Sequence, residues 1–237
     1  MELEFKFKSV PCFGKKVLCA RLKEFDKELV LSELESIQMK SKYYYDDHNI
    51  MKSAGITLRI REENSKWIFN IKEKIYSKEA EFKRYEIEFE LALGEVEQIV
   101  DNNDVIEIDE LEKIYDYHLA SLLSDNNVAL DYEKYSEYNR LSRDFKSLIS
   151  SIRINNAKVS IAATCNFVRD RILIKNKSFC IELAFDKGVL GRDVLLDEIE
   201  FEIKSGDILS ATEFINDFAK KLSLIPEEKS KFERSSV

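Results

Sequence analysis

The sequence predicts an α+β fold, a closed eight-stranded antiparallel β-barrel (tunnel) with a charged interior and helices packed outside. Three observations support this prediction. Strand-rich stretches flank a helical middle, the strand candidates alternate charged with apolar residues, and arginine or glutamate dominates the charged positions. We therefore expect a charged lumen inside a wall whose outer face is apolar.

The strand candidates are short runs rich in aromatic or β-branched residues that alternate with period two. They lie on both sides of the helical middle. In chain order they are Glu2–Lys8, Ser41–Asp47, Ile56–Glu62, Lys66–Glu73, Glu81–Leu91, Val159–Lys175, Ser178–Phe185 and Leu196–Lys204. Such alternation gives each strand of an antiparallel sheet one charged face and one apolar face.

Helices are expected where apolar residues recur at helical spacing. The pattern predicts helices over Asp109–Ser124 and Tyr132–Ile154, a third after Asp207, and a fourth near Leu22–Met39. The first two lie in a stretch at about 95–156 that we expect to be a helical insertion in a single domain spanning 1–237. Amphipathic helices of this kind would cover the apolar outer face of the barrel.

The composition limits the class of protein. The chain has 237 residues, of which 44% are hydrophobic, enough for one domain with a full core. It has no apolar run long enough to cross a bilayer and opens on a charged motif, so we expect a cytoplasmic protein without a membrane partner. The net charge of −8 disfavours general nucleic-acid binding. Cys12, Cys19, Cys165 and Cys180 lack zinc-site spacing, and we expect reduced thiols.

The first and last strand candidates show the charge alternation most clearly. One face of each carries only charged residues, namely Glu2, Glu4 and Lys6 in the first and Glu198, Glu200, Glu202 and Lys204 in the last. For a single strand, a solvated outer face explains such a pattern. That explanation weakens across the whole set, because solvent-facing positions usually mix serine, threonine and glutamine with the charged residues.

Arginines dominate the charged faces of other strand candidates. They are Arg59 with Arg61, Arg169 with Arg171, and Arg84 ahead of Glu86 and Glu88. Guanidinium groups match planar or tetrahedral anions, and charges inside a barrel need counter-ions. A polyanion with divalent cations would supply them, with arginine and lysine on phosphate oxygens and glutamate on the metal. The residues alone thus indicate phosphate and metal in a barrel, without specifying a reaction.

Together these motifs resemble the CYTH domain, a family of triphosphate tunnel metalloenzymes. A lone ExExK motif would be weak evidence, but the ordered set covers nearly the whole chain. The matches are ExExK at Glu2, Glu4 and Lys6; a tyrosine–aspartate, AG and LRxR block at Tyr45–Asp46, Ala54–Gly55 and Leu58–Arg61; a tryptophan-to-lysine strand at Trp67–Lys72; RxExE at Arg84, Glu86 and Glu88; RxR at Arg169 and Arg171; ExxxDxG at Glu182, Asp186 and Gly188; ExExExKSG at Glu198–Gly206; and SKxxR at Ser230, Lys231 and Arg234.

The resemblance implies a tunnel in which basic residues bind a triphosphate and glutamates bind Mg²⁺ or Mn²⁺. The expected metal ligands are Glu2, Glu4, Glu198, Glu200 and Glu202. The expected phosphate-binding residues are Lys6, Arg59, Arg61, Lys72, Arg84, Arg169, Arg171, Lys204, Lys231 and Arg234. Glu2, Glu4, Lys6 and Glu200 are expected at the catalytic centre, and Lys6 and Arg234 could also orient the glutamates.

The reaction we expect is metal-dependent hydrolysis of inorganic tripolyphosphate, a small-molecule triphosphate, to pyrophosphate and phosphate. The resemblance leaves other activities open: a thiamine or nucleoside triphosphatase, a class IV-type adenylyl cyclase, or a non-catalytic polyphosphate-binding module. We favour tripolyphosphate because the matched positions form a ring of arginine and lysine, while no segment can be assigned to a nucleobase. Binding energy concentrated on phosphates favours the compact polyanion.

Overall fold

A computed structural model describes residues 2–9, 14–101, 103–124 and 131–235. Within these residues, ten strands form one antiparallel sheet, eight of them long. The long strands are β1 (Glu2–Lys8), β3 (Glu35–Asp46), β4 (Ile56–Glu63), β5 (Lys66–Lys78), β6 (Glu81–Leu91), β7 (Val159–Lys175), β8 (Phe179–Leu190) and β9 (Val194–Gly206). The short strands β2 (Val30–Leu31) and β10 (Ile225–Pro226) pair with β7 and β1.

The sheet closes on itself through β1. The strand order is β1-β6-β5-β4-β3-β7-β8-β9, and β1 pairs with β9 as well as with β6. In the register, Glu2 lies opposite Arg84 of β6, and Glu4 lies opposite both Phe82 of β6 and Glu202 of β9. The predicted closed antiparallel barrel is therefore confirmed.

The two faces of the barrel wall differ as the alternation predicts. On β9, Ile199 and Phe201 are buried in an apolar cluster outside the wall, whereas Glu200 and Glu202 line the lumen. A residue's parity along the strand sets its side of the wall, because successive side chains point to opposite faces. The charged interior is thus confirmed.

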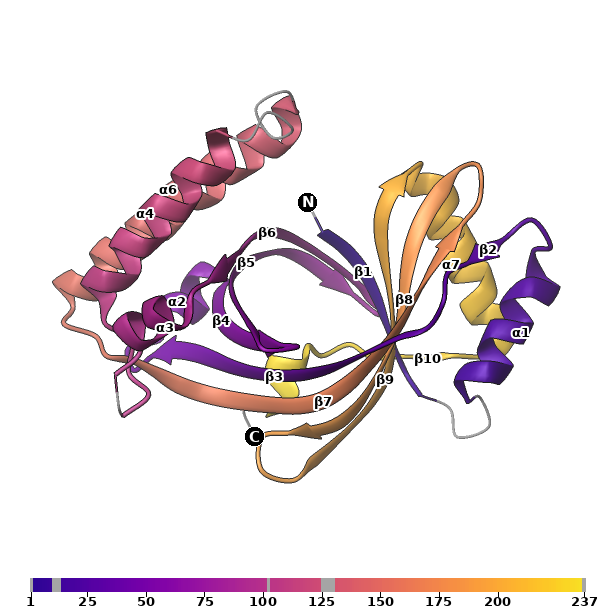
Figure 1. Cartoon of the computed structure of the whole chain (residues 1–237), viewed down its shortest axis with the longest axis horizontal. Coiled ribbons are helices and arrows are strands. Elements are labelled where there is room, and N and C mark those ends of the chain that lie inside the picture. Colours follow the sequence, from indigo (N-terminus) through magenta and orange to yellow (C-terminus); the bar gives the residue numbers. More distant parts are fainter. Residues whose placement is uncertain (1, 10–13, 102, 125–130, 236–237) are drawn as a thin grey trace.

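Two apolar clusters attach helices to opposite sides of the barrel (Figure 1). On one side, β4–β6 pack against α2 (Ile50–Ala54), α3 (Leu93–Ile99), α4 (Ile108–Ser124) and α6 (Tyr132–Ile154). On the other, β1, β8 and β9 pack against α1 (Lys15–Phe25) and α7 (Ile208–Leu222). Among the helices that the structure describes, none is long and apolar enough to cross a membrane.

Helix α7 begins directly after Asp207, as the sequence predicts. The Asp207 carboxylate accepts hydrogen bonds from the backbone N–H groups of Leu209 and Ser210, at 3.3 and 3.2 Å. Such a cap satisfies donors that the first helical turn leaves unpaired. Ser223 follows the helix with a left-handed backbone (φ 53°), which ends it.

The predicted helix over Leu22–Met39 is wrong. Helix α1 ends at Phe25, and β3 begins at Glu35. Within β3, Ile37 and Met39 are buried while Ser36, Gln38 and Lys40 are exposed, which is a period-two pattern. Residues 35–46 form a strand and not a helix because β3 pairs with β7 along its whole length and continues the barrel wall.

A short C-terminal helix, α8 (Lys231–Ser235), packs against β7 and β8. Its segment follows β10 and lies across the ring of strands, in yellow in Figure 1. The Phe232 ring stacks on Tyr45 with a centroid distance of 4.5 Å and also contacts Tyr43. The lumen next to α8 therefore includes aromatic side chains beside the charged ones.

Three cysteines are free thiols, namely Cys19, Cys165 and Cys180. Cys12 lies outside the described residues. The described thiols thus agree with the expected reduced state.

Candidate functional site

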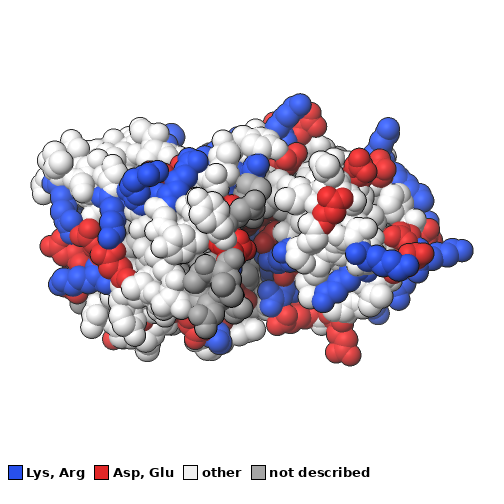
Figure 2. All heavy atoms as spheres, turned by 90° about the horizontal axis from the view of Figure 1, so that it is seen from above, with Lys and Arg blue, Asp and Glu red and all other residues white. Residues whose placement is uncertain are grey.

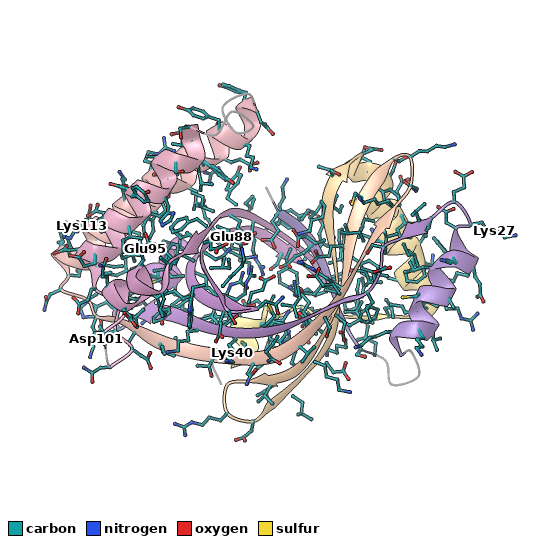
Figure 3. The ribbon with its side chains drawn as sticks, viewed as in Figure 1. Lys27, Lys40, Glu88, Glu95, Asp101 and Lys113 are labelled. Atoms are coloured by element: carbon teal, nitrogen blue, oxygen red, sulfur yellow. The ribbon has the colours of Figure 1, made fainter. Side chains whose placement is uncertain are left out.

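A cavity of about 930 Å³ lies in the barrel lumen, and each of the eight long strands contributes to its lining. Seen from above, the surface is hollowed between the side of the molecule that carries α4 and α6 and the side that carries α7 (Figure 2). Acidic and basic atoms are both visible in this hollow. Glu88 of β6 lies at the inner side of the wall (Figure 3).

Most of the predicted site residues meet in this cavity. The lining includes Glu2, Glu4, Lys6, Arg59, Arg61, Lys72, Arg84, Arg169, Arg171, Glu200, Glu202, Lys204 and Lys231. Glu198 and Arg234 are not part of the lining, although Glu198 is next to Lys231 and Arg234 is bonded to Glu198. Glu198 is only 1% exposed, which separates it from the lumen.

On β4, Arg59 and Arg61 belong to the basic wall of the cavity. Within the part of the chain that the structure describes, the Nε atoms of both side chains are buried and have no hydrogen-bond partner. Burial and the neighbouring Arg59 charge lower the pKa of Arg61, and Glu88 and Glu63 offset this only in part. An orphaned donor and an excess of positive charge are what an anion would relieve.

Other basic side chains are paired with the acidic residues of the lumen. Lys72 lies 2.7 Å from Glu2 and 3.3 Å from Glu86. Arg84 bonds Glu4, and Lys204 lies 2.6 Å from Glu202. These pairs place the acidic and basic groups side by side around the lumen instead of in separate halves.

Four of the five predicted metal ligands line the lumen, from two adjacent strands. Glu2 and Glu4 are on β1, and Glu200 and Glu202 are on β9, with Glu4 opposite Glu202 in the register. Burial and the nearby Glu2 charge raise the pKa of Glu202 to about 7. The shift shows that the charged form of Glu202 is disfavoured, mainly by burial, and a bound cation would stabilise that form.

The pKa of Glu4 shifts in the opposite direction, although the Glu4 side chain is also buried. Burial raises the pKa of Glu4, but the charges of Lys6 and Arg84 outweigh it, and the pKa falls below its usual value. The Lys6 ammonium lies 3.0 Å from Glu4 and also bonds Glu200. Lys6 therefore ties the two acidic strands together at the centre of the site.

A second acidic group lies between β8 and β9. Ligand oxygens of Asp186, Glu198 and Glu200 lie within 4.8 Å of one another, close enough to hold a metal ion. The sequence prediction included Glu198 and Glu200 but not Asp186 among the metal ligands. Lys231 of α8 contacts all three carboxylates.

Several lining residues were not predicted. Asn70 donates hydrogen bonds to Glu86 and to Glu88, the latter at 3.3 Å, and Tyr43 hydrogen-bonds Arg59. Lys74 lies on the lumen side of β5, two residues after Lys72. The alternation of β5 could have identified Lys74, since the period-two pattern continues past the predicted strand end at Glu73.

Helix α6 also borders the cavity. Asp131, just before the helix, and Lys134, Glu137 and Tyr138 on its first turns line the cavity on this side. Burial and the Glu86 charge raise the pKa of Tyr138. Helical residues between β6 and β7 therefore contribute to the edge of the site as well as to the outer core.

A scan of protein families finds a match to the model described as the CYTH domain, over residues 1–236. No curated protein matches the chain. Among solved structures, a Hippeastrum protein described as a candidate adenylyl cyclase with a dominant triphosphatase activity has a TM-score of 0.58 at 14% identity, covering 99% of this chain and 95% of the other. A candidate adenylate cyclase from Bacillus halodurans has a TM-score of 0.49 at 15% identity, covering 99% and 96%. A Pyrococcus furiosus protein of unassigned function has a TM-score of 0.47 at 19% identity, covering 98% and 99%.

Proposed function

Because the chain belongs to the CYTH domain family, we propose that it hydrolyses inorganic tripolyphosphate to pyrophosphate and phosphate inside the barrel, with the help of a divalent metal ion. One observation carries the proposal. Arg59 and Arg61 present buried donors without partners among the described residues, in the same cavity as the carboxylates of β1 and β9. A phosphate chain would accept hydrogen bonds from the arginine donors, and a metal ion would neutralise the carboxylates.

The basic wall would bind the phosphates from several strands at once. We assign this role to Lys6, Arg59, Arg61, Lys72, Arg84, Arg169, Arg171, Lys204 and Lys231, all of which line the cavity. Arg234 bonds Glu198 behind the lining, so we assign it to orienting that glutamate. Charges fixed before the substrate arrives cost little reorganisation in the transition state, when negative charge grows on the leaving pyrophosphate.

The carboxylates fit a hard divalent cation. Glu2, Glu4, Glu200 and Glu202 offer only oxygen atoms, and burial together with the Glu2 charge raises the pKa of Glu202. Oxygen ligands suit Mg²⁺ or Mn²⁺. When bound there, such an ion would supply positive charge to phosphate oxygens and acidify water. Lys6, between Glu4 and Glu200, would hold these two carboxylates in place.

An organic triphosphate is the second candidate, and one feature of the cavity favours it. Tyr138 of α6, Ile203 of β9 and Ile208 of α7 line the cavity together with the charged residues. An aromatic and two aliphatic side chains are able to contact a base or a thiamine ring. We place tripolyphosphate first because the charged groups of the lumen far outnumber these apolar contacts.

The substrate is decided by comparing kcat/KM for tripolyphosphate, ATP and thiamine triphosphate, each with Mg²⁺ and with Mn²⁺. We expect tripolyphosphate to give the highest value, with pyrophosphate and phosphate as products. An organic triphosphate preferred tenfold or more would replace tripolyphosphate as the substrate, and cAMP as the main product of ATP would make the protein a cyclase. Binding without turnover of any of them would indicate a polyphosphate-binding module.

A further inference from the structure

The ammonium group of Lys231 lies among the carboxylates of Asp186, Glu198 and Glu200. Its Nζ atom is 2.8 Å from Asp186 Oδ2 and 2.7 Å from Glu200 Oε1, and it also bonds Glu198 Oε1. Lys231 is 7% exposed, and Asp186 and Glu198 are 1% exposed. A buried ammonium on three carboxylates occupies the position in which the same oxygens would hold a metal ion.

The oxygens of these carboxylates already accept hydrogen bonds or ion pairs from fixed cations. Arg169 binds Asp186 through two nitrogens, at 2.8 and 2.6 Å, and also bonds Glu200 Oε2. Arg234 bonds the second oxygen of Glu198. Each carboxylate oxygen of Asp186 and Glu198 therefore has a cationic partner from the protein itself.

The environment of Glu202 is different. Among the described residues, the cation that it pairs with is Lys204, at 2.6 Å, and this lysine is 38% exposed at its side chain. An exposed lysine on a flexible stem leaves a carboxylate easily, whereas a buried, multiply bonded one does not. The metal site and the Lys231 site are therefore adjacent. Glu200 lines the lumen and contributes to both sites, whereas Asp186 and Glu198 are not part of the lining.

We propose that Lys231 is the resident cation of the Asp186–Glu198–Glu200 cluster, and that Asp186 and Glu198 are positioning residues that hold Lys231, and with it α8, against the tunnel wall. The inference rests on the proposed function and refines it, since it removes Glu198 from the metal ligands and leaves Glu2, Glu4, Glu200 and Glu202. The carboxyl-terminal segment then has a defined role, because it carries a fixed positive charge into the site.

Other contacts also hold the same segment, so removing the ammonium should loosen α8 without releasing the segment. The backbone N–H of Glu227 donates to the carbonyl of Lys6 at 2.9 Å, and β10 pairs with Phe7 and Lys8 of β1. Phe232 stacks on Tyr45. A variant that lacks only the Lys231 charge is therefore expected to fold with α8 near its place.

The test replaces Lys231 by methionine, which keeps an unbranched side chain one heavy atom shorter and removes the charge. We expect Lys231→Met to bind one more Mn²⁺ per chain than the wild type, counted by equilibrium dialysis and Mn²⁺ electron paramagnetic resonance without substrate. The midpoint of thermal unfolding of Lys231→Met should also rise with Mn²⁺ by more than that of the wild type. The double variant Lys231→Met/Glu198→Gln should lose the additional Mn²⁺.

Lys66→Met is the matched control, because Lys66 pairs with a single exposed carboxylate, Glu90, at 2.7 Å. It should not change the Mn²⁺ count. An unchanged count in Lys231→Met would overturn the proposal, because the carboxylates would then not be a cation site that Lys231 fills.

Glu198→Gln in the otherwise unchanged chain tests the same idea without removing Lys231. We expect its Mn²⁺ count and affinity to equal those of the wild type, while amide hydrogen exchange in residues 231–235 becomes faster. A loss of Mn²⁺ would make Glu198 a metal ligand and would overturn the proposal. A failure of the proposed function would show separately, in the wild type. If the wild type neither bound Mn²⁺ nor hydrolysed triphosphates, the Mn²⁺ count of Lys231→Met would still test whether Lys231 fills a cation site.

Discussion

Arg61 shows at the scale of a single residue how the site is prepared for an anion. Its guanidinium is largely buried, pairs with Glu63 at 3.0 Å and Glu88 at 3.2 Å, and lies near Arg59. Its Nε atom is buried without a partner in the described part of the chain. The charged form of Arg61 is thus less favourable in the folded protein than in water, and bound phosphate would reverse this.

Replacement of Arg61 by methionine should therefore separate activity from stability. We expect kcat/KM for tripolyphosphate to fall by about 10²-fold or more, as for other single preorganised groups worth roughly 2.7–4 kcal/mol. Without ligand, the variant should be as stable as the wild type or more stable, because the folded state disfavours the Arg61 charge. Steady-state kinetics and urea unfolding of the same preparation measure the two effects.

Arg143→Met is the control, since Arg143 on α6 is 77% exposed at its side chain and pairs only loosely with Asp144, at 3.7 Å. Both kcat/KM and stability should stay near the wild-type values. If Arg61→Met kept full activity, or lost stability in step with activity, Arg61 would be a structural partner of Glu63 and Glu88 and not a phosphate ligand.

At the scale of an element, β7 leaves no room for a side chain on β8 where Gly188 lies opposite Phe167. A methyl group at Gly188 would lie 2.6 Å from Phe167 Cβ and closer still to the Asn166 carbonyl oxygen. Phe167 lines the cavity, and its ring centroid is 5.4 Å from Lys231 Nζ. Gly188 therefore allows β8 to pack against β7 at Phe167, which contacts Lys231 of α8.

Gly188→Ala is expected to destabilise the fold, because backbone atoms that cannot move aside occupy the space of the new methyl group. The free energy of unfolding should fall by at least about 1–3 kcal/mol, measured by urea denaturation. Gly94→Ala is the control: in the described part of the chain, no atom beyond the chain neighbours of Gly94 and the backbone of α3 lies within 4 Å of the position that its new methyl group would take. There alanine should be neutral or stabilise by about 0.5–1 kcal/mol. Equal stability of the two variants would contradict the close approach of β7 and β8.

The elements also show what the sequence could predict and what it could not. Alternation identified which residues of β1, β4, β6 and β9 face the lumen, because parity alone decides this once a strand is formed. The region of α1 and β3 was misread as one helix over Leu22–Met39. Local patterns there are short and mixed, and pairing with β7, far along the chain, fixes β3.

Contacts between segments far apart in the chain also limit what the sequence predicts about the site. The sequence indicated that Lys231, Glu198 and Glu200 belong to one centre through their motifs. It could not indicate that Lys231 bonds Glu198, because this contact depends on the path by which β10 and α8 return across the barrel. Unpartnered atoms such as Arg61 Nε, in the part of the chain that the structure describes, are likewise properties of packing and have no signature in the sequence.

The whole molecule places its apolar cores and its charges on different sides of one wall. The two large apolar clusters lie outside the barrel, on opposite sides, and each includes residues from the strands and from the helices that cover them. Between them, the lumen is held together by ion pairs and lined by every long strand. A polyanion in the lumen would contact strands from both halves of the ring and so link the two cores.

Ligand binding should therefore stabilise the fold as a whole. With Mg²⁺ and a non-hydrolysable imido analogue of tripolyphosphate at about 100 times its Kd, linkage predicts about 2.7 kcal/mol of added stability. For a chain of this size, this corresponds to a rise in Tm of roughly 5–10 °C in one cooperative transition. The analogue without Mg²⁺ should give a smaller rise, because the carboxylates of β1 and β9 would then repel the phosphates. Sodium sulfate at equal ionic strength is the control for general anion effects, and it should leave Tm nearly unchanged. A rise of equal size with sulfate, or one that affects only part of the unfolding transition, would contradict a single anion site shared by all strands of the barrel.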